Sequence, residues 1–241
     1  MKDIITVLIK DLFKDKQYLL FAIISVLGSF ILINNISSKY IDTNVSFIIL
    51  FIYFLFNVIT VLMPVIASLI ILPISERVSG RIEFYISNNV TIKNLIILYS
   101  LVSFIASFIP NFLFNILYIL FCIIKNNSII LKTVFNIKYL ILGILFLIIV
   151  FLVCYILTML ILVVNRIDML RVILTFSNVA IIYISAIPIK IIAKSGYMIE
   201  QDNILLFSII FLIIVLSILI IISAIIKKKV NNENVILSFK Q

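Results

Sequence analysis

A short polar run between two long apolar segments holds the side chains of this sequence that are best suited to chemistry. Glu76, Arg77, Arg81 and Glu83 surround a single glycine, Gly80. Carboxylates and guanidinium groups spaced by three or four residues are neighbours on a helix surface, where they form ion pairs and charge-assisted hydrogen bonds. This pattern contains no nucleophile with an adjacent base, so it favours recognition of another protein over catalysis.

We expect residues 75–86 to form one short helix that lies parallel to a membrane and is exposed to the cytosol. Gly80 would lie between the two glutamates on one side of this helix. The apolar side chains gather on the opposite side and comprise Val78, Ile82 and Tyr85. A glycine inside a helix costs about 1 kcal/mol relative to alanine, so the close approach of another backbone is expected at Gly80. Pro73 should stop or bend the preceding helix, and Thr91 with Asn94 should cap the next one.

Several side chains that support chemistry in membranes are missing from the sequence. There is no His, and the four glycines form none of the glycine-rich loops that bind nucleotide phosphates. None of the 10 acidic residues falls inside a predicted span, which argues against transport coupled to protons. We therefore expect no enzymatic activity, metal or cofactor in this chain itself.

Long apolar runs must position the charged run, because 65% of the residues are hydrophobic and only 12% are charged. Runs of about 18 or more apolar residues predict transmembrane helices. Six runs meet this criterion: 18–35, 47–72, 95–124, 139–164, 170–192 and 204–226. Pro110 in the third run predicts a kink or an overhang beyond the bilayer. The predicted fold is an all-α integral membrane protein with six spans in a single domain over residues 1–241.

The segments outside the spans predict the orientation. Residues 1–17 place apolar and charged side chains on opposite sides of a helix, which is typical of an interfacial elbow helix. Basic residues are enriched there, in the loop at 73–94 and in the tail at 227–241. Basic segments stay in the cytoplasm, so both termini should be cytoplasmic, with spans one and two at 18–72 and spans three to six at 95–226. The net charge of +9 then reflects topology and attraction to lipid headgroups, and no nucleic-acid partner is expected.

Polar residues recur at helical spacing inside three spans. The second span has Asn57, Thr60 and Ser68 on one face, and the fifth has Thr175 and Asn178. A third-span stripe repeats the pattern with Ser100, Ser103, Ser107, Asn111, Asn115 and Tyr118. Small and hydroxylated residues commonly hold membrane helices together, so each stripe is either a packing surface or a surface that faces a substrate.

The charged run resembles the loop between the second and third spans of ABC-2 permeases, the membrane subunits of type-2 ABC transporters. That loop typically reads E-R-x-x-G-x-x-E, and here it stands as Glu76-Arg77-Val78-Ser79-Gly80-Arg81-Ile82-Glu83. The resemblance extends to the elbow helix, the six spans and the cytoplasmic termini. Two features depart from the family: Arg81 replaces its usual threonine, and the outside segment at 193–203 is short.

The resemblance implies a partner that supplies energy. A separate ATPase subunit would bind ATP and Mg²⁺ and dock on the short helix. The implied coupling residues are the polar rim of Glu76, Arg77, Arg81 and Glu83, together with Gly80 and the apolar Val78, Ile82 and Tyr85. The family also implies a second permease chain, identical or different, with the transport pathway between spans two and five. The candidate pathway residues are then Asn57, Thr60, Ser68, Thr175 and Asn178.

An uncharged pathway suits an amphipathic or hydrophobic cargo. By resemblance to compact permeases, we expect a bacterial plasma-membrane exporter of an antimicrobial peptide or drug, acting in antibiotic export or self-protection (bacteriocin immunity). Two alternatives remain open at this point. One is an ion-coupled secondary transporter, and the other is a membrane protein that only docks or senses a partner.

Overall fold

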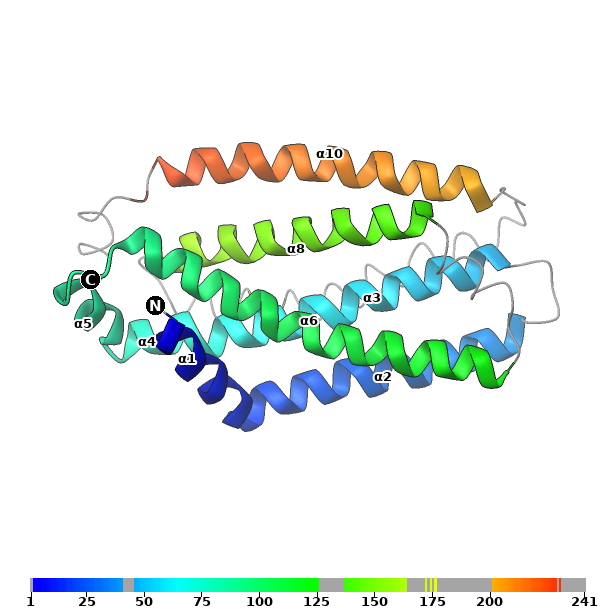
Figure 1. Cartoon of the computed structure of the whole chain (residues 1–241), viewed down its shortest axis with the longest axis horizontal. Coiled ribbons are helices and arrows are strands. Elements are labelled where there is room, and N and C mark those ends of the chain that lie inside the picture. Colours follow the sequence, from blue (N-terminus) through cyan, green and yellow to red (C-terminus); the bar gives the residue numbers. More distant parts are fainter. Residues whose placement is uncertain are drawn as a thin grey trace.

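A computed structural model describes residues 2–40, 46–125, 137–163, 172, 174, 176, 201–228 and 230. Every regular element in these ranges is a helix (Figure 1). The elements are α1 Lys2–Lys14, α2 Lys16–Tyr40, α3 Ser46–Leu69, the π-helical turn η1 Ile70–Ile74, α4 Ser75–Val78, α5 Arg81–Ser87, α6 Ile92–Ile124, α8 Ile137–Val163 and α10 Gln201–Lys227.

Five described helical segments are long and apolar enough to cross a membrane, so the chain is a membrane protein. They are Lys16–Asn35, Leu55–Val78, Ile92–Ile124, Tyr139–Val163 and Ile209–Lys227. These segments correspond to the first, second, third, fourth and sixth predicted spans. Except for positions 172, 174 and 176, the predicted fifth span at 170–192 lies outside the described residues.

The second of these segments continues further than the sequence predicted. Pro73 was expected to stop or bend the helix, yet the backbone stays helical through η1 and α4 as far as Val78. Pro73 lies inside the wide turn of η1. A π-turn accommodates one extra residue, so the chain passes the proline without leaving the helical path.

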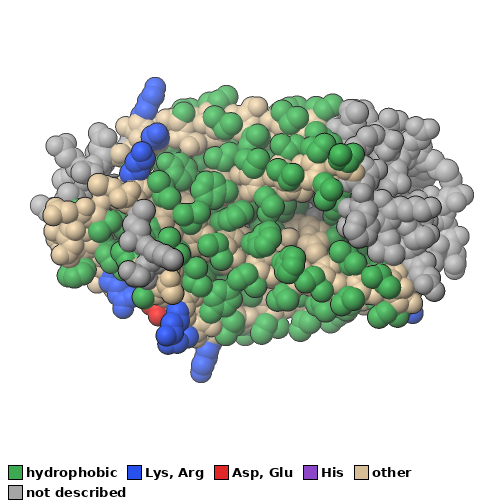
Figure 2. All heavy atoms as spheres, viewed as in Figure 1, with side chains coloured by type: hydrophobic (Ala, Val, Ile, Leu, Met, Phe, Trp, Pro, Cys, Tyr) green, Lys and Arg blue, Asp and Glu red, His purple; other side chains and the backbone are tan. Residues whose placement is uncertain are grey.

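The long helices form one elongated bundle, and among the five described spans the one that contains α3 is the most enclosed and α10 the least (Figure 1). α3 packs against α2 and α6, α6 packs against α8, and α10 contacts mainly α8. α4 and α5 form the tip at one end of the bundle, beside α1. Figure 2 shows hydrophobic side chains covering this face between the two ends, as a lipid-facing surface requires.

α1 has the amphipathic pattern that the sequence predicted. Leu8 and Leu12 are buried, whereas Lys10 and Lys14 are exposed. Asp15 ends this elbow and caps α2, because its Oδ1 accepts from the main-chain nitrogens of Gln17 at 2.7 Å and Tyr18 at 3.1 Å.

α6 is one continuous helix with Pro110 inside it. Its axis changes direction about halfway along in Figure 1, in agreement with the predicted kink. The predicted cap is also present, since Thr91 Oγ1 accepts from the main-chain nitrogen of Asn94 at 3.3 Å. The start of α6 is therefore fixed directly after the charged tip.

Candidate functional site

The tip consists of two short helices, so the prediction of one helix over residues 75–86 was wrong. α4 ends at Val78 and α5 begins at Arg81, with Ser79 and Gly80 between them. Gly80 has a φ of 74° and a ψ of 4°. This left-handed conformation suits glycine because a side chain would be strained there. No other part of the described chain approaches Gly80 closely, since a Cβ there would meet nothing within 4 Å.

The break at Gly80 changes which side chains point outward. Glu76 and Arg77 are each only 4% exposed, so they do not form the outer polar rim that the family resemblance implied. Val78 is 70% exposed, whereas Ile82 is fully buried, so these two residues do not share one face as expected. In one continuous helix, Val78 and Ile82 would lie on the same face. The left-handed turn at Gly80 changes the direction of α5, so the two side chains point different ways.

Glu76 is held inside the bundle by α6. The Tyr99 hydroxyl donates a hydrogen bond to Glu76 Oε2. Arg81 Nη1 lies 4.0 Å from Glu76 Oε1, and the Arg81 side chain is 63% exposed. The carboxylate therefore has a neutral donor on its buried side and a cation on its exposed side, which together reduce, but do not cancel, the cost of removing it from water.

Arg77 connects the tip to the end of α8. Its Nη1 donates a hydrogen bond to the main-chain oxygen of Ile161, which lies in the last turn of α8. A carbonyl oxygen that accepts from a charged donor makes a stronger hydrogen bond than one that accepts from a neutral donor. This buried contact fixes α4 relative to α8.

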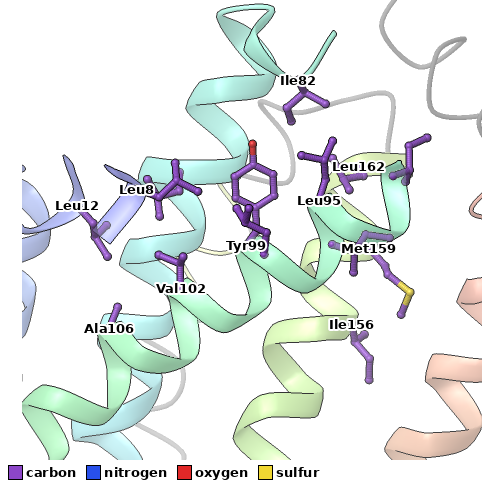
Figure 3. Close-up of a cluster of buried hydrophobic side chains, with 14 of the residues drawn as sticks. Leu8, Leu12, Ile82, Leu95, Tyr99, Val102, Ala106, Ile156, Met159 and Leu162 are labelled. Atoms are coloured by element: carbon purple, nitrogen blue, oxygen red, sulfur yellow. The ribbon is translucent and has the colours of Figure 1, made fainter. Parts of the chain in front are cut away.

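Ile82 anchors α5 in the same region. It belongs to a buried cluster with Leu8, Leu95, Tyr99 and Leu162 (Figure 3). This cluster joins α1, α5, α6 and α8. Tyr85 is half-buried against it. Burial and the nearby charge of Glu76 raise the pKa of the Tyr85 hydroxyl above its usual value, so this side chain stays neutral.

The outward surface of the tip is formed by Val78, Arg81, Glu83 and Phe84, and we call it the tip surface. All four side chains are exposed, with Phe84 at 66%. Phe84 was not among the predicted coupling residues, because a single continuous helix did not place it on either of the two predicted faces. Phe84 and Tyr85 form an aromatic pair within a polar run, and this pair was the sequence feature that could have indicated an exposed anchor.

Two of the candidate pathway residues belong to a polar network between α3 and α6. Asn111 Nδ2 lies 3.0 Å from both Asn57 Oδ1 and Thr60 Oγ1. Asn115 Nδ2 donates to Asn57 Oδ1 at 2.7 Å, and the Tyr53 hydroxyl donates to Asn115 Oδ1. The predicted stripes of the second and third spans thus face each other. The contact of Thr60 with Asn111 is one that holds two helices together.

The other candidate pathway residues are not part of this network. Ser68 is buried and donates to the main-chain oxygen of Val65 at 2.7 Å, within its own helix. Thr175 and Asn178 lie outside the described residues. The structure therefore brings together Asn57 and Thr60 and leaves Ser68 apart.

A cavity of about 360 Å³ lies beside the network. α3 contributes its base, and α6 and α8 contribute its walls. Figure 2 shows a recess on this face between rows of hydrophobic side chains. Its lining residues are Tyr53, Asn57, Phe108, Asn111, Asn115, Ile119, Tyr139, Leu140, Leu142, Gly143, Ile144, Phe146 and Leu147. None of these side chains carries a formal charge, and three of them are primary amides.

A second, more polar pocket of about 280 Å³ lies between α1 and the tip. Asp11, Asp15, Glu76 and Arg81 contribute to its lining. Within the described part of the chain, no group of three or more His, Cys, Asp or Glu side chains could hold a metal ion.

No family model, curated protein or solved structure matches this chain.

Proposed function

We propose that this chain is the membrane-spanning permease subunit of an ATP-driven transporter of the ABC-2 type, powered by a separate ATPase subunit. The observation that carries the proposal is that the tip has two different sides. Its inner side is bonded to α6 and α8, and its outer side exposes two large apolar side chains between charged ones.

The tip surface is suited to a protein partner. Val78 and Phe84 are large and exposed at the end of a bundle, where lipid is not expected to cover them. Arg81 and Glu83 lie beside them and supply charges of both signs. Apolar anchors surrounded by polar groups are the usual composition of a protein interface. An ATPase subunit that holds ATP and Mg²⁺ would dock here.

The inner side of the tip provides a mechanism for transmitting motion. Movement of α4 would act on α6 through Glu76 and Tyr99, and on α8 through Arg77 and Ile161. Ile82 adds apolar packing on the same side. Because both polar contacts are buried, they resist being pulled apart, and the partner's displacement would reach two spans together.

The distribution of charge supports a cytoplasmic location for the tip. Figure 2 shows that Lys and Arg side chains gather at the tip end of this face. Basic residues are retained on the cytoplasmic side of a membrane. With a span at 170–192, the chain would have six spans and two cytoplasmic termini, and two such chains would form the transport unit.

The cargo that fits best is amphipathic or hydrophobic and carries no strong charge. The polar groups described inside the bundle are mainly amides and hydroxyls. Such groups favour neutral hydrogen-bonding cargo over ions. An antimicrobial peptide or a drug exported across a bacterial plasma membrane has this chemistry.

Co-purification tests the ATPase partner. The tagged chain is isolated from its host in mild detergent, and the preparation is assayed for a bound protein with ATPase activity. We expect the double variant Val78→Asp/Phe84→Asp to lose that protein while keeping the wild-type unfolding temperature. Ile124→Asp places one such charge on an exposed apolar residue at the other end and serves as the control. An ATPase retained equally in all three would contradict the proposal.

Transport into vesicles separates the two alternatives. A docking or sensor protein would bind the ATPase without ATP-dependent movement of cargo. An ion-coupled carrier would move cargo when a proton or sodium gradient is imposed without ATP. Glu76 is the feature that favours the ion-coupled carrier, because this carboxylate is buried at the end of an apolar span.

A further inference from the structure

The cavity between α6 and α8 lies in the half of the bundle away from the tip. It opens beside residues that face the surroundings of the bundle, since Leu140 and Ile144 are largely exposed. A molecule could therefore enter sideways from the lipid. At about 360 Å³, its volume lies at the lower end of the roughly 300–1,000 Å³ that is usual for ligand pockets.

The base of the cavity has hydrogen-bonding capacity that the protein does not use fully. Asn111 Oδ1 accepts from Asn115 Nδ2 at 3.2 Å, which leaves one of its two lone-pair positions open. Hydrocarbon cannot satisfy this oxygen, whereas a ligand that donates a hydrogen bond could.

Gly143 gives the cavity part of its space. It lies on the α8 wall, and a Cβ added there would meet nothing within 4 Å. In membrane helices a glycine usually permits close packing of a neighbouring helix. Among the described residues nothing occupies this neighbouring position, so the glycine enlarges the cavity.

We propose that this cavity is a lateral binding site for an uncharged amphiphile, with an amide or hydroxyl group on Asn57, Asn111 and Asn115 and an aliphatic chain between α6 and α8. The chain would contact Phe108, Ile119 and Leu147. No lining side chain carries a formal charge that could pair with an ionic headgroup. The same chemistry is found in neutral glycerolipids and in capped hydrophobic peptides, so either could be the source.

The proposal does not depend on the ATPase, so the full chain alone in lipid nanodiscs is sufficient to test it. The probe is hexadecanamide with a diazirine in its chain and a terminal alkyne, and labelled residues are mapped by mass spectrometry. We expect labelling to concentrate in residues 108–119 and 139–147. A probe with the same chain and a trimethylammonium headgroup should label these residues only at background.

Filling the cavity should remove the site. Gly143→Leu should lower labelling about tenfold, and Gly143→Ala should lower it less. Gly28→Leu is the matched control, because a Cβ at Gly28 in α2 also meets nothing within 4 Å. If Gly143→Leu does not fold, Ile144→Trp at the exposed mouth serves the same purpose. Labelling unchanged in the cavity variants, or equal labelling by the charged probe, would overturn the proposal.

Competition then identifies the source of the ligand. Loss of labelling with excess dioleoylglycerol indicates a membrane lipid, and loss with an acetylated dileucine amide indicates a peptide-like cargo. Both results support the site. A second copy of the chain is the remaining occupant to be tested. If Ile144→Cys forms a disulfide-linked dimer and the wild-type cavity is not labelled, the mouth is a dimer interface and the proposal is wrong.

Discussion

The hydroxyl of Tyr18 donates a hydrogen bond to the main-chain oxygen of Ala106, 2.6 Å away. Ala106 precedes Pro110 by four residues, so its oxygen is the one that an N–H at position 110 would have bonded. Tyr18 is fully buried at the start of α2, directly after the elbow. The tyrosine thus satisfies the group that the proline leaves open and joins α2 to the bend of α6.

Removing this hydroxyl should destabilise the protein through the unpaired oxygen. We expect Tyr18→Phe to lower the free energy of unfolding by about 1–3 kcal/mol, measured by reversible unfolding in detergent micelles. In a Pro110→Ala background the restored N–H can bond the Ala106 oxygen, so the same change should cost much less. An equal cost in both backgrounds would show that the Tyr18 contact does not compensate for the proline.

The left-handed backbone at Gly80 predicts an order among substitutions. Gly80→Ala should lower the free energy of unfolding by about 1–2 kcal/mol, because a Cβ is strained at a φ of 74°. Gly80→Asn should cost less, since asparagine tolerates this region better. Gly28→Ala is the control, and it should be neutral or stabilising within helix α2. An alanine tolerated equally well at both positions would contradict the strained turn.

Arg77 and Arg81 should behave differently although both are arginines of one motif. Arg77→Met removes the hydrogen bond to Ile161 and should cost about 2 kcal/mol of unfolding free energy. Arg81→Met affects an exposed side chain 4.0 Å from its carboxylate and should cost about 0.5 kcal/mol or less. Thermal unfolding of the two variants side by side distinguishes them. Equal losses would mean that Arg77 does not bond α8.

The amide network should stabilise the pairing of α3 with α6. Asn115→Ala removes the bonds to Asn57 and Tyr53 and should cost about 1–2 kcal/mol of unfolding free energy. Ser217→Ala is a suitable control, because this exposed serine bonds only its own helix, at Ile213. A double-mutant cycle of Asn57→Ala with Asn115→Ala measures the interaction directly. Fully additive costs would show that the two amides act independently.

Hydropathy alone predicted the long helices well. Membrane spans must satisfy their backbone hydrogen bonds internally, so length and apolar content are sufficient to locate them. The amphipathic α1 and the Thr91 cap also follow from local rules, because periodicity and capping involve residues close in sequence. Pro73 does not end the helix, because the wide turn of η1 accommodates it, and hydropathy gives no sign of such a turn.

The orientation of the charged side chains could not be predicted from the sequence. Glu76 and Arg77 look like surface residues, and their burial depends on Tyr99 and Ile161, which lie far away in the chain. A helical wheel is valid only for one continuous helix, and the turn at Gly80 divides the run into two helices. The stripes that contain Asn57 and Asn115 were each predicted from the sequence. Their pairing was not, because it depends on how α3 packs against α6.

The π-helical turn η1 sets the rotational register of everything that follows it. One residue corresponds to about 100° of rotation in an α-helix. If the same residues formed ordinary α-helix, Glu76 and Arg77 would turn about a quarter of the way around the axis, away from Tyr99 and Ile161. The inward direction of both charges thus depends on the wide turn taking up a single extra residue, and a variant that straightened this turn would detach the tip from the bundle while leaving every apolar span intact.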